Sequence, residues 1–234
     1  MERKYAQYLL EKTYQDYNLI ADDYTRTRSF IPEDIKNLGE YAKGGEKILD
    51  LGCANGRFFE VLNGKKVEYV GIDKSEKLIE IARKKYPGVK FQVGDAFNLS
   101  FPDNYFDKIF SISVFHHMPS EELRQEFLEE AKRVLKPNGL LILRVWDFWR
   151  RKGFWKTILK NILMRLAGES KLRFNDVFIP WKNSQGETVA QRYFHCFTKK
   201  ELENLIMKAK FEIKESWRGG IDPTRTNIYS VAKK

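Results

Sequence analysis

Residues 50–57 form a glycine-bearing turn that suits a nucleotide-like ligand. The segment reads Asp50-Leu51-Gly52-Cys53-Ala54-Asn55-Gly56-Arg57 and follows a short apolar run. A dinucleotide fingerprint that begins at Gly52 requires glycines at 52, 54 and 57, where this chain has Gly, Ala and Arg. Because an arginine cannot supply close helix–strand packing and a methyl group crowds a pyrophosphate, the turn argues against a nicotinamide cofactor. The Asp-x-Gly-x-x-x-Gly pattern instead suits a ligand that lies against the glycines without a phosphate.

Two further carboxylates follow the next two predicted strands. Asp73 lies 21 residues after Gly52 and can accept both ribose hydroxyls of an adenosine cofactor. Asp95, in the segment Gly94-Asp95-Ala96, can accept from an adenine amino group. The position of Asp73 suits NAD and S-adenosylmethionine equally, and the glycine positions favour S-adenosylmethionine. Each motif alone is also compatible with an ordinary turn, but three of them on successive strands favour a cofactor site.

S-adenosylmethionine is a methyl donor, and the chain lacks two motifs that identify common methyl acceptors. Amino-group methylation of bases usually uses an Asn/Asp-Pro-Pro-aromatic tetrad after the fourth strand, where this chain has Ser111–Met118. Methylation at carbon five of a pyrimidine usually needs an exposed cysteine thiolate. Cys53 lies in the cofactor turn and Cys196 has no such surroundings, so both are expected to be packed thiols. The pair His116-His117 lacks a third ligand, so no metal is expected, and His116 is expected to be packed.

The order of apolar runs predicts the elements that position these residues. Strands are expected at 48–51, 67–73, 89–95, 106–114 and 140–145, and Ser75 and Ser120 cap two intervening helices. The second of these helices is expected to end at Pro137-Asn138-Gly139. The first 45 residues are expected to be helical, and a helix at 199–210 with strands at 211–218 and 227–232 follows later. This alternation predicts an α/β fold with a mostly parallel sheet and a ligand site at the carboxyl ends of its strands.

The 234 residues suffice for one α/β domain, with 1–47 as a helical N-terminal cap and 147–191 as a basic insertion. A hydrophobic share of 42% excludes global disorder, and two cysteines exclude a disulfide scaffold. The sequence has neither a membrane-spanning apolar run nor a signal pattern, so a cytosolic protein is expected. Residues 144–192 contribute +7 to the net charge of +10. This asymmetry favours a polyanionic partner such as nucleic acid or an anionic membrane, although a solvated Lys-rich surface has the same composition.

Residues 48–146 resemble the class I S-adenosylmethionine-dependent methyltransferases. The segments Ile48–Gly56, Tyr69–Asp73, Gly94–Ala96, Phe106–Met118 and Arg133–Leu143 occur in the order and spacing of that family. The resemblance implies a Rossmann-like, seven-stranded sheet with an antiparallel last strand and S-adenosyl-L-methionine as the cofactor. Position 54 is more commonly glycine in the family, which accepts small residues there. The expected cofactor-binding residues are Asp50, Gly52, Cys53, Ala54, Asn55, Gly56, Asp73, Lys74, Asp95, Ala96 and Ser111.

Segments outside this core resemble a narrower family, the tRNA wobble-uridine carboxymethyl methyltransferases. They are Tyr17–Arg28, the pair His116-His117, Asp176–Trp181, and Arg192–His195, which is followed by Phe197 and Glu201-Leu202. The Arg-Tyr-aromatic-His block at 192–195 is the most specific of them. The resemblance implies methyl esterification of a 5-carboxymethyl group on the first uridine of the tRNA anticodon loop. It also implies a small zinc-binding activator subunit that pairs with the sheet.

This implied reaction needs no general base, because a carboxylic acid with a pKa of about 4 is already ionised at neutral pH. The site must hold the acceptor oxygen in line with the sulfonium methyl and supply donors to the other carboxylate oxygen. A surface ion pair is the alternative role for Arg192. The expected acceptor-site residues are the main donors Arg28 and Arg192, the secondary donors His117 and His195, and Tyr24 and Tyr193, which would stack on or hydrogen-bond the uracil.

Residues 154–166 depart from the pattern of that family. Their apolar positions follow helical spacing, with Lys156, Lys160 and Arg165 outside the apolar stripe. Such a helix could cover the acceptor pocket, contact tRNA, lie on a membrane surface or pack on the sheet domain, and no stable membrane association is expected. Two rival functions share the cofactor motifs: a small-molecule methyltransferase of the quinone-biosynthesis type, and a non-catalytic cofactor-binding subunit.

Overall fold

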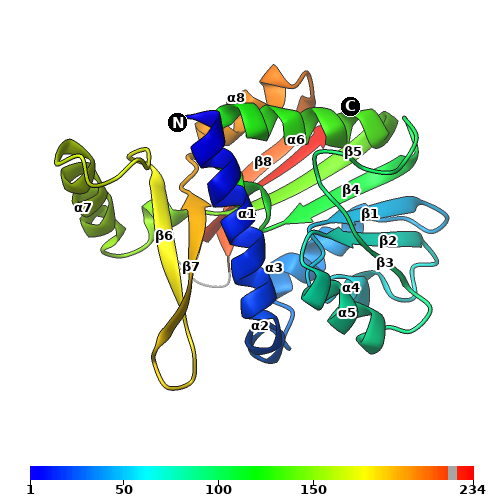
Figure 1. Ribbon diagram of the computed structural model, residues 1–234. Helices are drawn as coiled ribbons and strands as arrows, with labels where there is room; N and C mark the ends of the chain where they lie inside the picture. Colours follow the sequence, from blue (N-terminus) through cyan, green and yellow to red (C-terminus); the bar gives the residue numbers. More distant parts are fainter. Residues whose placement is uncertain (221–225) are drawn as a thin grey trace.

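The computed structural model describes residues 1–220 and 226–234, and a seven-stranded sheet lies at its centre (Figure 1). The strand order is β3-β2-β1-β4-β5-β9-β8. β1 to β5 are parallel, and β9 is antiparallel to both of its neighbours. The predicted mostly parallel sheet with an antiparallel last strand is confirmed. Its strands are β1 (Lys47–Leu51), β2 (Glu68–Asp73), β3 (Lys90–Val93), β4 (Phe106–Ile112), β5 (Leu135–Trp146), β8 (Glu212–Gly220) and β9 (Thr226–Lys233).

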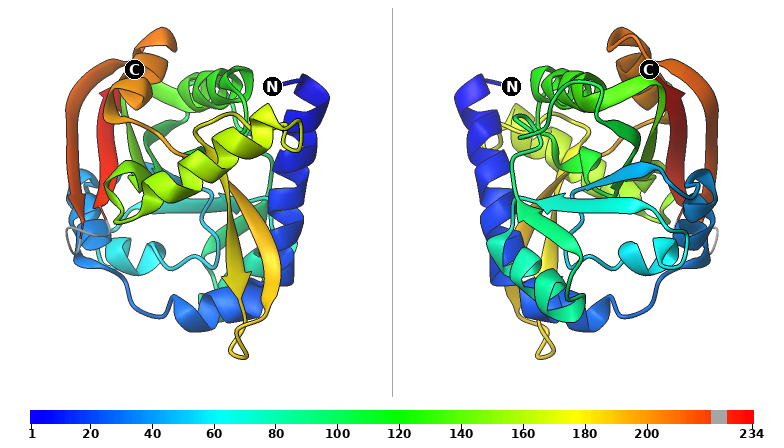
Figure 2. Two further views of the ribbon diagram at one scale, coloured as in Figure 1. Left: turned by 90° about the vertical axis from the view of Figure 1, so that its left-hand side faces the viewer. Right: turned by 90° about the vertical axis from the view of Figure 1, so that its right-hand side faces the viewer.

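Helices cover both faces of this sheet (Figure 2). Leu49 and Leu51 of β1 contribute to one core cluster and Ile48 to another, because successive strand side chains point to opposite faces. α6 (Glu121–Val134) and α8 (Lys199–Lys208) pack in the first cluster. The second cluster holds α3 (Glu33–Lys36), the 3₁₀ turn η1 (Asn37–Tyr41), α4 (Phe59–Leu62) and α5 (Glu76–Lys85).

The two predicted serine caps are confirmed, and the predicted end of α6 is wrong. Ser75 accepts from the backbone N–H of Leu78, and Ser120 accepts from that of Leu123. α6 ends at Val134 because Leu135 has an extended backbone, with φ −80° and ψ 135°. Leu135 pairs with Phe106, so β5 begins there and runs through residues 137–139.

A second, two-stranded sheet lies beside the main one and was not expected from the sequence. It is a hairpin of β6 (Asp176–Lys182) and β7 (Thr188–His195), in which Ile179 pairs with Arg192. α1 (Arg3–Leu19) packs along β7 and leads into α2 (Ala21–Thr27) (Figure 1). Lys12 of α1 donates to the Gln191 carbonyl at 3.1 Å. The hairpin therefore brings residues from 176–195 against the N-terminal helices.

The predicted helix at 154–166 is confirmed as α7 (Phe154–Leu166). Phe154 and Ile158 are buried in a cluster with residues of β6 and β7, so the helix packs on the hairpin. Its opposite side is solvent-exposed at Trp155, Leu159, Leu163 and Leu166. Figure 1 shows α7 at the periphery of the molecule, beyond β6.

An ion pair joins α3 to the carboxyl end of β5. Nη2 of Arg144, near the end of β5, lies 2.9 Å from Oδ2 of Asp34 in α3, and both side chains are about nine-tenths buried. The Tyr229 hydroxyl also donates to Asp34, and Asn227 donates to it at 3.3 Å. Since removing one partner strands a buried charge, this pair holds α3 in place over the carboxyl edge.

We expect Asp34→Ala to lower the free energy of unfolding by about 3 kcal/mol, because the buried Arg144 guanidinium loses its carboxylate. Urea denaturation measures this change. Glu33→Ala is the matched control, since Glu33 is exposed and pairs with Lys36 at the surface, and it should change stability by less than about 0.5 kcal/mol. An Asp34→Ala variant as stable as this control would contradict the proposed role of the pair.

Candidate active site

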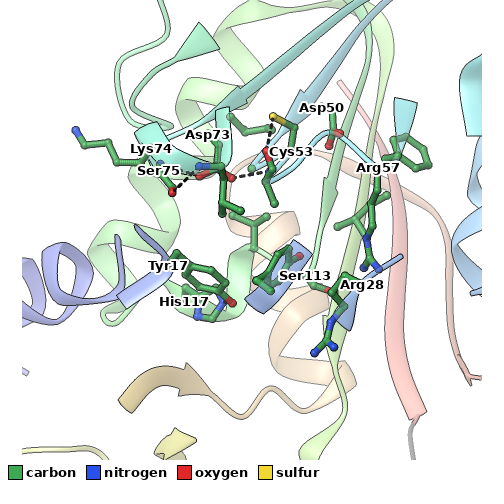
Figure 3. A pocket seen from close by; sticks show the side chains of 18 of the residues that line it. Tyr17, Arg28, Asp50, Cys53, Arg57, Asp73, Lys74, Ser75, Ser113 and His117 are labelled. Atoms are coloured by element: carbon green, nitrogen blue, oxygen red, sulfur yellow. Dashed lines mark hydrogen bonds between the residues drawn. The ribbon is translucent and has the colours of Figure 1, made fainter. Parts of the chain in front are cut away.

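A cavity of about 390 Å³ lies at the carboxyl ends of β1, β2, β4 and β5. The turn after β1 and the end of β2 form one side (Figure 3). α1, α2, the 3₁₀ turn η2 (Phe115–His117) and β7 form the other side. This is the edge that the strand order predicted. No residue of α7 lines the cavity, so the structure does not support the interpretation of α7 as a lid.

The turn after β1 has the geometry that its glycine predicts. Gly52 has φ +84°, and a Cβ at this position would lie 2.2 Å from Cγ2 of Val114. Ala54 also has a positive φ, of 50°, and its N–H donates to Oδ2 of Asp73 at 2.8 Å. Oδ1 of Asp73 accepts from the N–H of Ser75 at 2.9 Å. Each carboxylate oxygen is thus fixed by one backbone bond and keeps capacity to accept a further hydrogen bond from a ligand.

Asp50 is a buried carboxyl group that lines the same cavity. Burial raises the pKa of Asp50 to about 7, and the hydrogen bond from the Tyr69 hydroxyl, at 2.7 Å, partly offsets the rise. A carboxyl group that titrates near neutral pH ionises when a cation binds beside it. The charge of Asp50 therefore favours a cationic ligand in this part of the cavity.

Seven of the eleven expected cofactor-binding residues line the cavity, and four do not. The lining set is Asp50, Gly52, Cys53, Ala54, Asp73, Lys74 and Ala96. Asp95 accepts from Lys74 at 2.8 Å and from the N–H of Phe97 at 3.0 Å, next to the lining residues Gly94 and Ala96. The remaining three lie behind the cavity wall: Asn55 and Ser111 are buried, and Gly56 faces Phe91.

The acceptor side of the cavity contains two arginines stacked on aromatic rings. The guanidinium carbon of Arg192 lies 4.7 Å from the ring centroid of Trp181, and that of Arg28 lies 5.3 Å from the same ring. Tyr24 packs beside Trp181, with ring centroids 6.0 Å apart. The Trp181 indole N–H donates to Asp23 at 2.6 Å, which fixes the orientation of the ring. Of the expected acceptor residues, Arg28, Arg192, Tyr24 and His117 line this cavity.

The geometry assigns His117 a different task from the expected one. Nδ1 donates to the Tyr193 carbonyl at 2.7 Å, since a carbonyl only accepts, and this leaves Nε2 as an acceptor. Nε2 lies 3.0 Å from the Tyr17 hydroxyl, which donates to it. Burial lowers the pKa of His117 to about 3, so the ring is neutral. His117 consequently cannot donate to a bound carboxylate, and it positions Tyr17 instead.

His195 and Tyr193 were expected in the acceptor site, and the structure places both outside the cavity lining. His195 is buried between Asp176, 2.7 Å from Nδ1, and Glu201, 2.8 Å from Nε2. The Tyr193 hydroxyl donates to the Pro119 carbonyl at 3.3 Å. Side chains alternate along β7, so Tyr193 and His195 lie on the opposite side of the strand from Arg192, which faces the cavity. Their hydrogen bonds join the hairpin to neighbouring segments, and neither side chain lines the cavity.

Among the lining residues that were not singled out from the sequence, three are polar or aromatic groups near the arginines or at the end of β5. Tyr17 lies at the carboxyl end of α1, and Arg144 and Trp146 end β5. Tyr17 can be identified only from its hydrogen bond with His117. Arg144 can be identified only when the end of β5 is known to lie at the cavity. Both cysteines are buried, and burial raises the pKa of each thiol, as expected for packed thiols.

Within residues 1–220 and 226–234, no three His, Cys, Asp or Glu side chains lie close enough to hold a metal ion. In the same part of the chain, no helix has the length and apolar character that crossing a bilayer requires.

Comparison with known proteins agrees with this geometry. A family model described as a methyltransferase domain matches residues 49–143. A solved SAM-dependent methyltransferase from Methanosarcina mazei is 26% identical, with a TM-score of 0.70 over 85% of this chain and 96% of that one. This chain contains a methyltransferase domain and has the fold of S-adenosylmethionine-dependent methyltransferases. A Haloferax volcanii methyltransferase solved with its Trm112 activator, at 17% identity and a TM-score of 0.63 over 94% of this chain and 96% of that one, shares the fold.

Curated relatives include two named tRNA (carboxymethyluridine(34)-5-O)-methyltransferase. The Schizosaccharomyces pombe protein is 28% identical over 97% of this chain and 98% of its own length. The Arabidopsis thaliana protein is 34% identical over 58% of this chain and 33% of its own length. The methyltransferase chain described here thus spans nearly all of the yeast relative and about a third of the plant one.

We expect Gly52→Ala to weaken the binding of S-adenosylhomocysteine at least tenfold, because the added methyl group displaces Val114 and strains a left-handed backbone. Isothermal calorimetry measures the affinity. Gly45→Ala is the matched control: Gly45 has φ +82°, but a Cβ there meets no atom within 4 Å. Equal losses in the two variants would mean that backbone strain alone, and not the shape of the turn, causes the effect.

The raised pKa of Asp50 predicts that S-adenosylmethionine binding releases a proton. With a pKa of about 7 in the free protein, release is close to one proton well below pH 7, about half a proton at pH 7 and close to zero at pH 8.5. Calorimetry in buffers of different ionisation enthalpy measures this number. Asp50→Asn should abolish the release. Tyr69→Phe should move it to higher pH, because the bond from Tyr69 lowers the pKa; a pH-independent release in both would contradict the assignment.

Proposed function

We propose that the protein methyl-esterifies the carboxymethyl group of 5-carboxymethyluridine at the wobble position of tRNA. One observation carries this proposal, namely the state of Arg192. Its side chain lines the cavity yet is only 4% exposed, and its Nε is buried without a hydrogen-bond partner among the described residues. In that same part of the chain no carboxylate lies within ion-pair distance of it. A buried cation of this kind calls for an anion, and the planar fork of arginine matches a carboxylate.

Arg28 and Arg192, which line one cavity and both lie against the Trp181 ring, would hold the acceptor carboxylate. Arg192 is oriented by the Tyr17 hydroxyl, 3.5 Å from Nη1, and Tyr17 by His117. An ionised carboxylate needs no general base, which agrees with a cavity in which His117 is engaged by Tyr17 and His116 accepts from the Trp146 N–H. Bound S-adenosylmethionine supplies an activated methyl group, whose transfer to a carboxylate oxygen forms the ester. The protein contributes position and charge.

The cofactor fits the other half of the cavity. We assign the ribose hydroxyls to Asp73, whose two oxygens keep acceptor capacity, and the cationic end of the cofactor to Asp50. The absence of a Cβ at Gly52 lets Val114 pack against the turn, and Gly52 itself lines the cavity. Lys74 and Asp95 form an ion pair at 2.8 Å beside Ala96, where the adenine would lie.

The uracil is assigned to the aromatic surface around the arginines. Tyr24 lines the cavity and packs on the buried Trp181 ring, and RNA bases that leave the stack are commonly held on aromatic rings of this kind. The name of the yeast relative supports the tRNA assignment, because this chain matches that protein over almost its whole length. The two arginines argue against the quinone-type alternative, which needs an apolar acceptor pocket.

We also propose a small zinc-binding activator subunit as a protein partner. β3 forms one edge of the main sheet, and Val93 at its end is 43% exposed. An edge strand offers unpaired backbone groups to a strand of another chain. The activator of the Haloferax methyltransferase makes such a partner reasonable for this fold. We propose the cytoplasm as the location of the reaction, because the proposed substrate is a tRNA.

We expect Arg192→Ala to lower kcat/KM for tRNA that carries 5-carboxymethyluridine about 100-fold, because a charge-assisted fork contributes roughly 2–3 kcal/mol. The affinity for S-adenosylmethionine should stay unchanged. Lys182→Ala is the control, since it removes one positive charge from the same hairpin at an exposed position. Methylation rates with labelled cofactor measure both. A fully active Arg192→Ala enzyme would rule out the assignment of the acceptor carboxylate to this residue.

A further inference from the structure

A second cavity, of about 430 Å³, lies between the N-terminal end of α6 and α8, which lines it from the cap residue Thr198 to Lys208. These two helices lie side by side on one face of the sheet (Figure 1). Arg173, in the segment before β6, completes the cavity. None of the residues that line it belongs to the lining of the active-site cavity.

Both helices direct their positive ends at this cavity. α6 has 14 residues and α8 has 10, so each has a full set of aligned peptide dipoles. Ser120 and Thr198 cap one backbone N–H each, at Leu123 and Glu201. The first-turn N–H groups that no cap satisfies favour an anion near each end.

Arg124 is a separate observation that points to a ligand in the cavity. Its side chain is 1% exposed and lines the cavity. Nε donates to the Met118 carbonyl at 3.1 Å, and the guanidinium lies over Phe197, 5.2 Å from the ring centroid. Nη2 is buried with no hydrogen-bond partner in the described part of the chain. A buried N–H without an acceptor is costly, so an oxyanion in the cavity would complete the arrangement.

The charges that face the cavity add up to an excess of cations. Its carboxylates are engaged: Glu121 by Lys208 at 2.6 Å, and Glu201 by His195 at 2.8 Å. Arg124 lies farther from Glu201, with Nη1 at 4.0 Å. Arg173 and Lys200 also line the cavity, and within residues 1–220 and 226–234 neither lies within 4.0 Å of a carboxylate. Arg173 and Lys200 therefore face the cavity without a close carboxylate, and Arg124 shares Glu201 with His195.

We infer that this cavity binds a backbone phosphate of the RNA substrate, an inference that rests on the proposed function. Arg192 in the active site and Thr198 at the second cavity are six residues apart on one chain segment. A fully extended segment of that length spans at most about 20 Å, which a few nucleotides can bridge. A phosphate held here would fix the register of the anticodon arm, so that the wobble uridine meets Arg192.

The test uses the double variant Arg173→Ala/Lys200→Ala, since Lys200 is exposed and Arg173 is half-buried, so neither supports the core. Lys84→Ala/Lys214→Ala is the matched control, with two cations removed from α5 and β8, away from both cavities. The dissociation constant for tRNA is measured for each protein between 50 and 200 mM salt. We expect the first variant to bind about tenfold more weakly, with the slope of log K against log[salt] reduced by about one, and the control to match the wild type.

Steady-state kinetics separate this role from a catalytic one. In the double variant KM for tRNA should rise while kcat and cofactor affinity stay unchanged, and methylation of free 5-carboxymethyluridine nucleoside should not differ from the wild type. Arg124→Lys, checked by thermal unfolding, keeps the charge but removes the Nη2 donor, and should raise KM for tRNA in the same way. A double variant with wild-type tRNA affinity and slope, or a control with an equal loss, would overturn the inference.

Inorganic phosphate distinguishes a free anion from the RNA backbone. Calorimetric binding of phosphate to the wild type but not to the double variant, together with unchanged tRNA binding, would overturn the RNA assignment in favour of a free phosphate. Failure of the wild type to methylate tRNA at all is a different result and refutes the proposed function. Weaker tRNA binding by the double variant, with the reaction intact, supports both.

Discussion

A guanidinium cannot lose its charge inside a protein, and the acceptor side of this methyltransferase is arranged around that constraint. Arg192 is buried among Trp181, Tyr17 and Phe194, and none of the described carboxylates neutralises it. Ring faces and one tyrosine hydroxyl offset only part of the desolvation cost. The hydrogen bonds from Tyr17 through His117 to the backbone of β7 hold the charge where it is. An anionic acceptor would neutralise this buried charge, and the carboxylate of the proposed substrate is such an acceptor.

The cofactor half of the site could be predicted from local sequence. The turn at Gly52, the carboxylate of Asp73 and the strands before them follow from apolar runs, glycine positions and spacing, which act over short stretches of chain. The parallel sheet then brings these short stretches to one edge. Gly56 and Ser111 were expected to contact the cofactor for the same local reason. They lie behind the cavity wall because strand periodicity and close packing, which spacing does not reveal, direct them into the core.

The acceptor half depends on long-range contacts, and it was predicted less well. The hairpin at 176–195 was missed, although its turn contains polar residues and Gly186. In the structure Gly186 has φ +84°, which favours glycine. Without the hairpin, the side of β7 on which Arg192 lies could not be derived. His117 was given a donor role because the sequence does not show which of its two ring nitrogens carries the proton. Only the contact with the Tyr193 carbonyl, 76 positions away, assigns the proton to Nδ1.

The central claim is that a carboxylate accepts the methyl group, and the chemical stability of the product tests it most directly. tRNA carrying 5-carboxymethyluridine is incubated with methyl-labelled S-adenosylmethionine and the enzyme, with and without an activator subunit. The isolated RNA is then held in mild alkali. The account predicts that the label leaves as volatile methanol, because only a methyl ester hydrolyses under these conditions. Label that stays in the RNA would place the methyl group on a base or ribose atom and contradict the account.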